Sequence, residues 1–169
     1  MPAGLPLSVH VGILRRDGGD RLTMMKVYLD LCALKRPFDD QRQGRILIET
    51  AAVTRILEAA TSGILTLCNS TALTAENRRN PNQQRRARVE TLLEWIGKPT
   101  PATPAVLRRG EALVRQGFRD MDALHLSFAE ALRAEWFVTV DDQILARATS
   151  VKLGVPVTDV IEFVRERKL

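Results

Sequence analysis

Hydrophobic residues along the chain follow two alternating patterns. Short apolar runs rich in β-forming residues have the length of buried strands. Between these runs, apolar residues recur every three or four positions, as on one face of an amphipathic helix. The runs predict strands at 26–29, 64–68, 136–140 and 155–157, and the periodic segments predict helices at 41–60, 70–79, 83–96, 105–116, 120–134, 141–152 and 160–167.

Strands that alternate with helices indicate βαβ units, so we expect an α/β protein whose mostly parallel sheet is covered by helices on both faces. The segment 30–40 contains Pro37, Asp39 and Asp40 and is predicted to be a turn-rich connection. Gly97 and three prolines predict a rigid linker before the helix at 105–116. Strands and helices alternate throughout 24–169 and the composition does not change along this range, which predicts a single domain.

Residues 1–23 are predicted to be an N-terminal extension, because Gly18-Gly19 separates them from the first strong strand pattern. Two explanations stay open at this point. Translation that starts at Met24 or Met25 would make the extension a mis-assigned start, and we favour this reading. The alternative is an extra strand that pairs with a partner.

Acidic residues follow the predicted strands. Asp30 closes the first strand, Asp141 closes the strand at 136–140, and Glu76 lies in the helix after 64–68. Asp122 begins the helix that leads into 136–140. Ligands of open α/β sheets bind outside the carboxyl ends of the strands, so these four acids are candidates for one site.

Each acid also has a purely structural explanation. Asp120 and Asp141 have the position of helix N-caps, and Asp122 in a first turn would favour the helix dipole. Glu76 could pair with Arg79, and Asp30 could be a turn residue. For Asp122 the apolar stripes that follow it predict a buried face, where an uncompensated carboxylate is costly. We expect His125, one turn later, to pack or form hydrogen bonds rather than bind a metal.

Clustered carboxylates repel one another, and a hard divalent cation removes this repulsion. Only two histidines and two cysteines occur, with no spacing typical of a zinc site, so carboxylates would have to hold any metal. The net charge of +5 favours a polyanionic partner, although a basic surface is also common without one. The unpaired cysteines and the lack of a spanning apolar run or a signal pattern predict a cytoplasmic protein with no membrane partner.

Four segments in this order resemble the PIN-domain family, specifically its VapC-like toxin branch. Any one of them is a weak signal, but four in order are specific, and they span nearly all of the chain after the extension. They are Val27-Tyr28-Leu29-Asp30 with 36–41, 70–76 with 79–81, 122–126, and 137–142.

The resemblance implies a three-layer α/β/α fold and a metal site built by Asp30, Glu76, Asp122 and Asp141. It also implies Mg²⁺ or Mn²⁺ as cofactor and hydrolysis of RNA phosphodiesters to 5′-phosphate and 3′-hydroxyl ends. Thr139 matches a position that supports the fourth acid or a bound water. Asp142 and Asp120 are second-tier candidates, and Glu49 with Arg45 matches a recurrent helix pattern that a surface ion pair explains equally well.

The sequence departs from the family pattern at Leu31, where members commonly carry a hydroxyl residue after the first aspartate. The missing hydroxyl would weaken support for the metal ligand without removing an acid.

The resemblance further implies a cognate antitoxin as partner, and members commonly form homodimers. A dense basic stretch provides the RNA-contact candidates, with a solvated helix face as the alternative for each: Arg78, Arg79, Arg85, Arg86 and Arg88. Two other functions stay open, a PIN-fold nuclease of RNA processing and a catalytically inactive module that binds RNA or protein.

Overall fold

A four-stranded parallel sheet forms the centre of the computed structural model, which describes residues 15–16 and 22–169. Its strands stand in the order β4-β3-β5-β6, so the first strand of the sheet in the sequence lies inside it. The strands are β3 (Met25–Leu29), β4 (Leu65–Leu67), β5 (Trp136–Thr139) and β6 (Val157–Asp159). All three strand pairings are parallel, as the sequence predicts.

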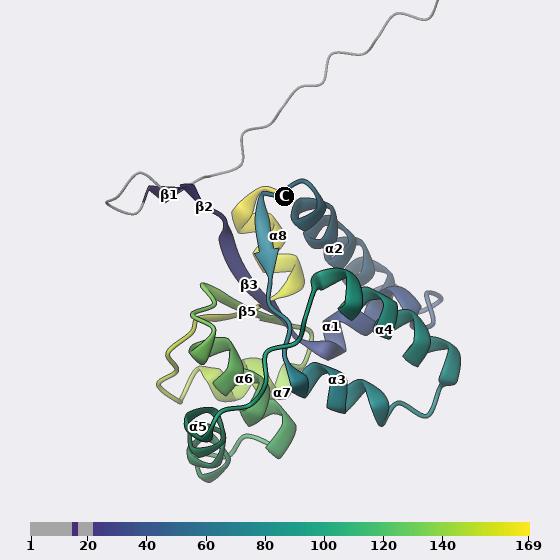
Figure 1. Ribbon diagram of the computed structural model, residues 1–169. Helices are drawn as coiled ribbons and strands as arrows, with labels where there is room; N and C mark the ends of the chain where they lie inside the picture. The colour runs from purple at the N-terminus through teal and green to yellow at the C-terminus, as the bar shows by residue number, and fades with distance from the viewer. Residues whose placement is uncertain (1–14, 17–21) are drawn as a thin grey trace, which may run out of the picture.

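Helices cover both faces of the sheet, which confirms the three-layer α/β/α fold (Figure 1). α2 and α8 pack together on one side, and α6 and α7 lie on the other. α3 and α4 form a hairpin beside the carboxyl edge, and α5 packs along α6. The helices are α1 (Leu31–Lys35), α2 (Gly44–Thr61), α3 (Thr71–Arg78), α4 (Gln83–Ile96), α5 (Pro104–Arg115), α6 (Asp120–Ala131), α7 (Asp142–Ala148) and α8 (Val160–Arg167).

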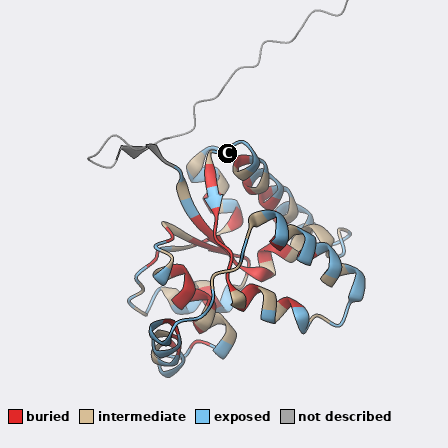
Figure 2. Cartoon of the chain, viewed as in Figure 1, coloured by how far each residue is buried: buried red, intermediate tan, exposed pale blue. Residues whose placement is uncertain are grey.

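The buried residues lie between these layers, as Figure 2 shows. The side chains in the carboxyl halves of β3 and β5, residues 27–29 and 137–139, are buried, because helices cover both faces of these strands. Tyr28 stacks on Phe137 with ring centroids 5.5 Å apart, which fixes β3 against β5 in the middle of the core. The carboxyl ends of β3 and β5 therefore meet at one edge, with Asp30 N donating to Val138 O over 2.9 Å.

The segment predicted to be turn-rich is mostly helical. α1 follows Asp30 directly, and a 3₁₀ turn, η1 (Arg36–Phe38), follows α1. The carboxylate of Asp30 caps α1 by accepting from Leu31 N, so the acid that ends a strand also begins a helix. Pro37 lies in the first turn of η1, where a missing N–H costs nothing, and does not exclude helical structure there.

Other predicted boundaries move by a few residues. α2 begins at Gly44 rather than at 41, and α7 ends at Ala148. α6 ends at Ala131 because Arg133 adopts a left-handed backbone with φ 54°, which terminates a helix. β6 pairs at Val157–Asp159, two residues later than predicted.

Within the predicted extension, β1 (Arg15–Arg16) and β2 (Leu22–Thr23) pair antiparallel, apart from the four-stranded sheet. The prediction for 1–14 and 17–21 lies outside the described residues. No helix in the described part of the chain combines the length and apolar character that a bilayer span requires.

Candidate metal centre

Asp30 lies at the carboxyl end of the central strand β3 and is only 4% exposed. Its Oδ1 accepts from Leu31 N over 2.8 Å. Its Oδ2 accepts from Thr139 Oγ1 over 2.8 Å and from Cys32 Sγ over 2.9 Å. All of these donors are neutral, and within 15–16 and 22–169 no lysine, arginine or histidine forms an ion pair with Asp30.

These contacts show how Asp30 is held although Leu31 lacks the hydroxyl that family members commonly carry at this position. The Leu31 side chain is buried in the core, and a hydroxyl reaches Asp30 from Thr139 instead. Burial first, and the neighbouring Asp30 second, raise the pKa of the Cys32 thiol far above its ordinary value, so that it remains a donor. Support for the first acid therefore comes from β5 and from α1 rather than from the residue after it.

Glu76 belongs to a buried hydrogen-bond chain. Its Oε2 lies 2.7 Å from His125 Nε2, and His125 Nδ1 lies 2.8 Å from the Tyr28 hydroxyl. The Tyr28 hydroxyl is 2.7 Å from Ser70 Oγ, which also caps α3. An ionised Glu76 only accepts, so Nε2 donates to it, and in the neutral imidazole Nδ1 accepts from Tyr28. The alternative explanation, in which Glu76 pairs with Arg79, is wrong, because the Glu76 carboxylate contacts His125 of α6 instead.

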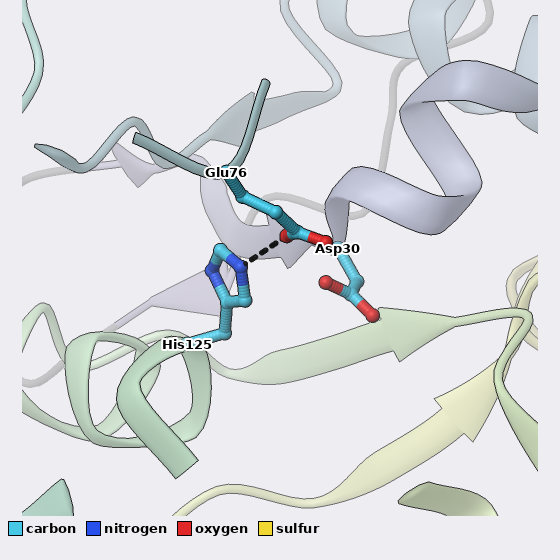
Figure 3. A group of neighbouring side chains, drawn as sticks. All are labelled: Asp30, Glu76 and His125. Atoms are coloured by element: carbon cyan, nitrogen blue, oxygen red, sulfur yellow. Dashed lines mark hydrogen bonds and ion pairs between the residues drawn. The ribbon is translucent and has the colours of Figure 1, made fainter. Parts of the chain in front are cut away.

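The first two acids converge with His125 (Figure 3). One ligand atom each of Asp30, Glu76 and His125 lies within 4.8 Å of the others, from three different elements. Both ring nitrogens of His125 already have hydrogen-bond partners, which fits the predicted hydrogen-bonding role better than that of a metal ligand.

Asp122 and Asp141 meet on one arginine. Arg119 donates from Nε to Asp122 Oδ2 over 2.7 Å and from Nη2 to Asp141 Oδ2 over 2.5 Å. Asp141 also caps α7, since its Oδ1 accepts from Gln143 N and Ile144 N. Thr139 connects this pair to Asp30, because its Oγ1 donates to Asp30 and accepts from Asp141 N.

The pKa shifts of Asp122, Glu76 and His125 also reflect the closeness of these charged groups. Burial raises the pKa of Asp122, and the charges of Asp30 and Asp141 add to this increase against the opposing effect of Arg119. Burial is the largest single effect on Glu76 and opposes its ionisation, but the hydrogen bond from His125 and the charges of His125, Lys35 and Arg119 together hold the pKa of Glu76 below its ordinary value. Burial would lower the pKa of His125, yet Glu76 and Asp30 raise it above the ordinary value.

Two of the supporting candidates belong to a separate ion-pair network. Glu49 is buried rather than at the surface, and accepts from Arg36 Nε over 2.5 Å and from Arg45 Nε over 2.7 Å. Arg45 also holds Asp142 through two hydrogen bonds of 2.7 and 2.8 Å. The Arg45–Glu49 pair predicted from the sequence is therefore present, but Glu49 is saturated by arginines.

Asp120 is exposed in the first turn of α6. The prediction that it caps this helix is wrong, because the N-cap is Arg119, without a side-chain cap bond.

The five basic candidates differ in their surroundings. Arg78 and Arg79 are exposed at the end of α3. Arg85 is paired with Asp39 at 2.9 Å, Arg86 donates to Asn80 O, and Arg88 lies over the Phe38 ring. Arg78 and Arg86 also line a cavity of about 560 Å³ between α3 and α4.

The carboxylates fit a hard divalent cation by the chemistry of their donors. Mg²⁺ and Mn²⁺ prefer oxygen ligands and bind through few carboxylates plus water. Asp30 and Glu76 supply such oxygens side by side, and Asp30 is a buried carboxylate without an ion-pair partner among the described residues. A buried charge of this kind is costly unless a cation compensates it.

Comparisons with known proteins identify the fold. No family model and no curated protein matches the sequence. The crystal structure of VapBC2 from Rickettsia felis, bound to a DNA fragment from their promoter, is similar with a TM-score of 0.53 and 12% identity, over 80% of this chain and 98% of that one. PAE2754 from Pyrobaculum aerophilum matches at 16% identity with a TM-score of 0.47, over 86% of this chain and 98% of the other.

In general terms, the chain has the architecture of an α/β/α protein with acidic residues at the carboxyl edge of a parallel sheet. More narrowly, its fold is similar to the VapC-like PIN-domain fold, on the likeness to the VapBC2 structure. At these identities the likeness establishes the fold, and the chemistry has to be argued from the residues.

Sequence reasoning missed Arg119 and Cys32. Arg119 directly precedes Asp120, at the start of the helix predicted at 120–134. Its spacing of three residues to Asp122 is the ion-pair spacing of a helix and is a signal that was available. Nothing in the sequence indicates that Cys32 contacts Asp30, because the contact depends on the unpredicted helix α1.

Proposed function

We propose that this chain is a metal-dependent endoribonuclease that hydrolyses RNA phosphodiesters with Mg²⁺ or Mn²⁺. Asp30, Glu76, Asp122 and Asp141 would hold the metal. The observation that carries the proposal is Asp30, a buried carboxylate with only neutral donors that lies beside a second carboxylate. The net charge of +5 supports a polyanionic substrate.

In this mechanism the chain orients the acids and balances charge. Thr139 and Leu31 N fix Asp30, while His125 fixes Glu76 and is itself held by Tyr28. A bound metal ion would supply Lewis acidity and an activated water, the chemistry that phosphodiester hydrolysis needs. Arg119 is more than half exposed and could pair with a phosphate oxygen in place of Asp122 and Asp141. Water adds across the P–O3′ bond, which leaves a 5′-phosphate and a 3′-hydroxyl.

The test is cleavage of a mixed RNA pool by purified protein with Mn²⁺, with EDTA, and after Asp122→Asn. We expect cleavage only by the wild-type protein with metal. Glu111→Gln is the matched control, because Glu111 is exposed on α5 and lies outside the acid cluster. Equal cleavage by the wild type and Asp122→Asn, or cleavage that survives EDTA, would contradict the proposal.

We further propose a role as the toxin of a type II toxin–antitoxin pair in the cytoplasm, with a cognate antitoxin as partner. The fold shared with VapBC2 and the basic charge, which suits an acidic antitoxin segment, support this role. Expression in a bacterial host should arrest growth, and Asp122→Asn should relieve the arrest. RNA cleavage in vitro without growth arrest would favour an RNA-processing nuclease instead.

A further inference from the structure

A cavity of about 400 Å³ opens beside Asp122, between the α5–α6 turn and α7. This volume is in the range of ordinary ligand sites. Its polar side chains come from Arg119, Gln143, Arg147 and Ser150, and its apolar wall includes the buried Phe118 and Ile144. The cavity therefore joins the acid cluster at one end, since Asp122 belongs to both.

Arg147 differs from the other arginines of this region. Arg119 is paired with two aspartates and Arg109 with Glu130. Among residues 15–16 and 22–169, no acid forms an ion pair with Arg147, although it is exposed on α7. It is therefore a positive charge at the cavity wall that no carboxylate of the described residues pairs with, since Asp122 in the same cavity is paired with Arg119.

Gly117 makes room for this guanidinium. A Cβ atom on Gly117 would lie 3.0 Å from Arg147 Cζ and 3.2 Å from Nε, closer than side chains normally approach. Gly117 also has φ +97°, a conformation that favours glycine. The α5–α6 turn thus lets the Arg147 side chain lie flat against its backbone, at the wall of the cavity.

We propose that this cavity binds the phosphodiester next to the scissile one in the RNA substrate, with Arg147 as the main contact. The inference rests on the proposed function, because it takes the scissile phosphate to lie at the acid cluster. A strand whose phosphate lies there must continue to either side, and the cavity begins at Asp122. Arginine presents a planar fork that matches phosphate oxygens, and Gln143 and Ser150 add uncharged donors.

The cavity is distinct from the basic stretch 78–88. Arg85 and Arg88 are held by Asp39 and Phe38, so part of that stretch is committed to contacts within the protein. Arg147 forms no ion pair in the described chain and lies on α7, in the cavity that begins at Asp122. On the Asp122 side of the site, RNA would therefore be bound by Arg147, which does not belong to the densest basic stretch of the sequence.

The test measures binding without catalysis. A fluorescein-labelled single-stranded RNA oligonucleotide is titrated in EDTA at several salt concentrations, with wild type, Arg147→Ala, Arg147→Lys and Arg55→Ala. The control Arg55 is an exposed arginine of α2 outside the cavity, and its loss changes the net charge equally. Loss of one phosphate contact should weaken binding roughly tenfold and reduce the slope of log K against log salt by about 0.7.

We expect Arg147→Ala to show both changes, Arg147→Lys to recover the slope but only part of the affinity, and Arg55→Ala to resemble the wild type. In Mn²⁺, Arg147→Ala should raise KM for RNA cleavage with kcat little changed. Equal behaviour of Arg147→Ala and Arg55→Ala in a protein that binds and cleaves RNA would overturn the cavity assignment alone. A wild-type protein that neither binds nor cleaves RNA would overturn the proposed function. Arg147→Ala that binds RNA normally but loses affinity for a polyglutamate peptide would assign the cavity to an acidic protein segment and also overturn the inference.

Discussion

Asp30 and Glu49 are two carboxylates with the same 4% exposure but opposite surroundings. Glu49, on α2, accepts from two arginines and is neutralised within the protein. Asp30, at the end of β3, accepts only from an amide, a hydroxyl and a thiol. Burial alone therefore does not mark a functional acid. What distinguishes Asp30 is that no lysine, arginine or histidine of the described residues forms a direct ion pair with it, so a metal ion would supply the missing partner.

The largest expected effect comes from removing this charge. Asp30→Asn should reduce Mn²⁺-dependent RNA cleavage at least about 100-fold, because the proposed function makes Asp30 a metal ligand. Its metal-free melting temperature should stay near the wild-type value, since the substitution removes an uncompensated buried charge. Calorimetry with and without Mn²⁺ should show metal stabilisation of the wild type only. Full cleavage by Asp30→Asn, or a loss of stability equal to that of Glu49→Gln, would show that Asp30 and Glu49 do not differ in function as argued above.

The matching change at Glu49 should act on stability. Glu49→Gln leaves Arg36 and Arg45 without their shared carboxylate and should lower the free energy of unfolding by about 2 kcal/mol. Metal affinity should change little, because Glu49 is paired with Arg36 and Arg45 and is not part of the acid cluster. Urea unfolding and Mn²⁺ titration together check both statements. A protein of unchanged stability whose Mn²⁺ affinity collapses would make Glu49 a ligand instead.

Substitutions of His125 test whether Glu76 acts in metal binding, as proposed for Asp30, or only in stability, as expected for Glu49. His125→Gln keeps an amide near the position of Nε2 that can donate to Glu76, whereas His125→Asn does not reach that far. The Mn²⁺ concentration for half-maximal cleavage should rise about tenfold in His125→Asn and less in His125→Gln. Both variants lose the ring from a buried position, so their difference isolates the bond to Glu76. Identical metal dependence of the two variants would limit His125 to packing.

The smallest effect is expected at Glu130, which like Glu49 is held by an arginine. Burial would raise the pKa of Glu130, but Arg109 and Gly154 N hold it below the ordinary value. Its contribution to stability is present above the pKa of the unfolded chain and is lost as the pH falls through the lower folded value. Glu130→Gln should therefore lower the melting temperature at pH 7, and the gap should close below the ordinary glutamate value of 4.5. Melting curves across this range, with Glu111→Gln as control, measure the effect; a gap that widens in acid would have the wrong sign.

The fold was predictable because strand and helix periods alternate clearly, and so was the position of Asp30 and Asp141 where strands end; the joint metal site of the four acids stays a prediction. The partners of these acids were not predictable. Thr139 reaches Asp30 only because β3 pairs with β5, 109 residues away along the chain. Arg119 contacts Asp141 across 22 residues in the same way. Such contacts follow from the packing of distant segments, which periodicity does not report.

Glu49 and α1 show the limits of local reading. An i,i+4 pair with Arg45 looks like a surface feature, and the second arginine that buries Glu49 comes from η1. The segment after Asp30 reads as a turn because Pro37 and two aspartates dominate its composition. A five-residue helix capped by Asp30 is too short to show a period of its own.

The position of β3 between β4 and β5 has a consequence for synthesis of the chain. Asp30 emerges early from the ribosome, but the strand that supplies Thr139 and leads to Asp141 is among the last elements to be made. A nascent chain therefore carries an incomplete set of acids until translation is nearly finished. In the nuclease proposed above, the complete site would therefore form only near the end of synthesis.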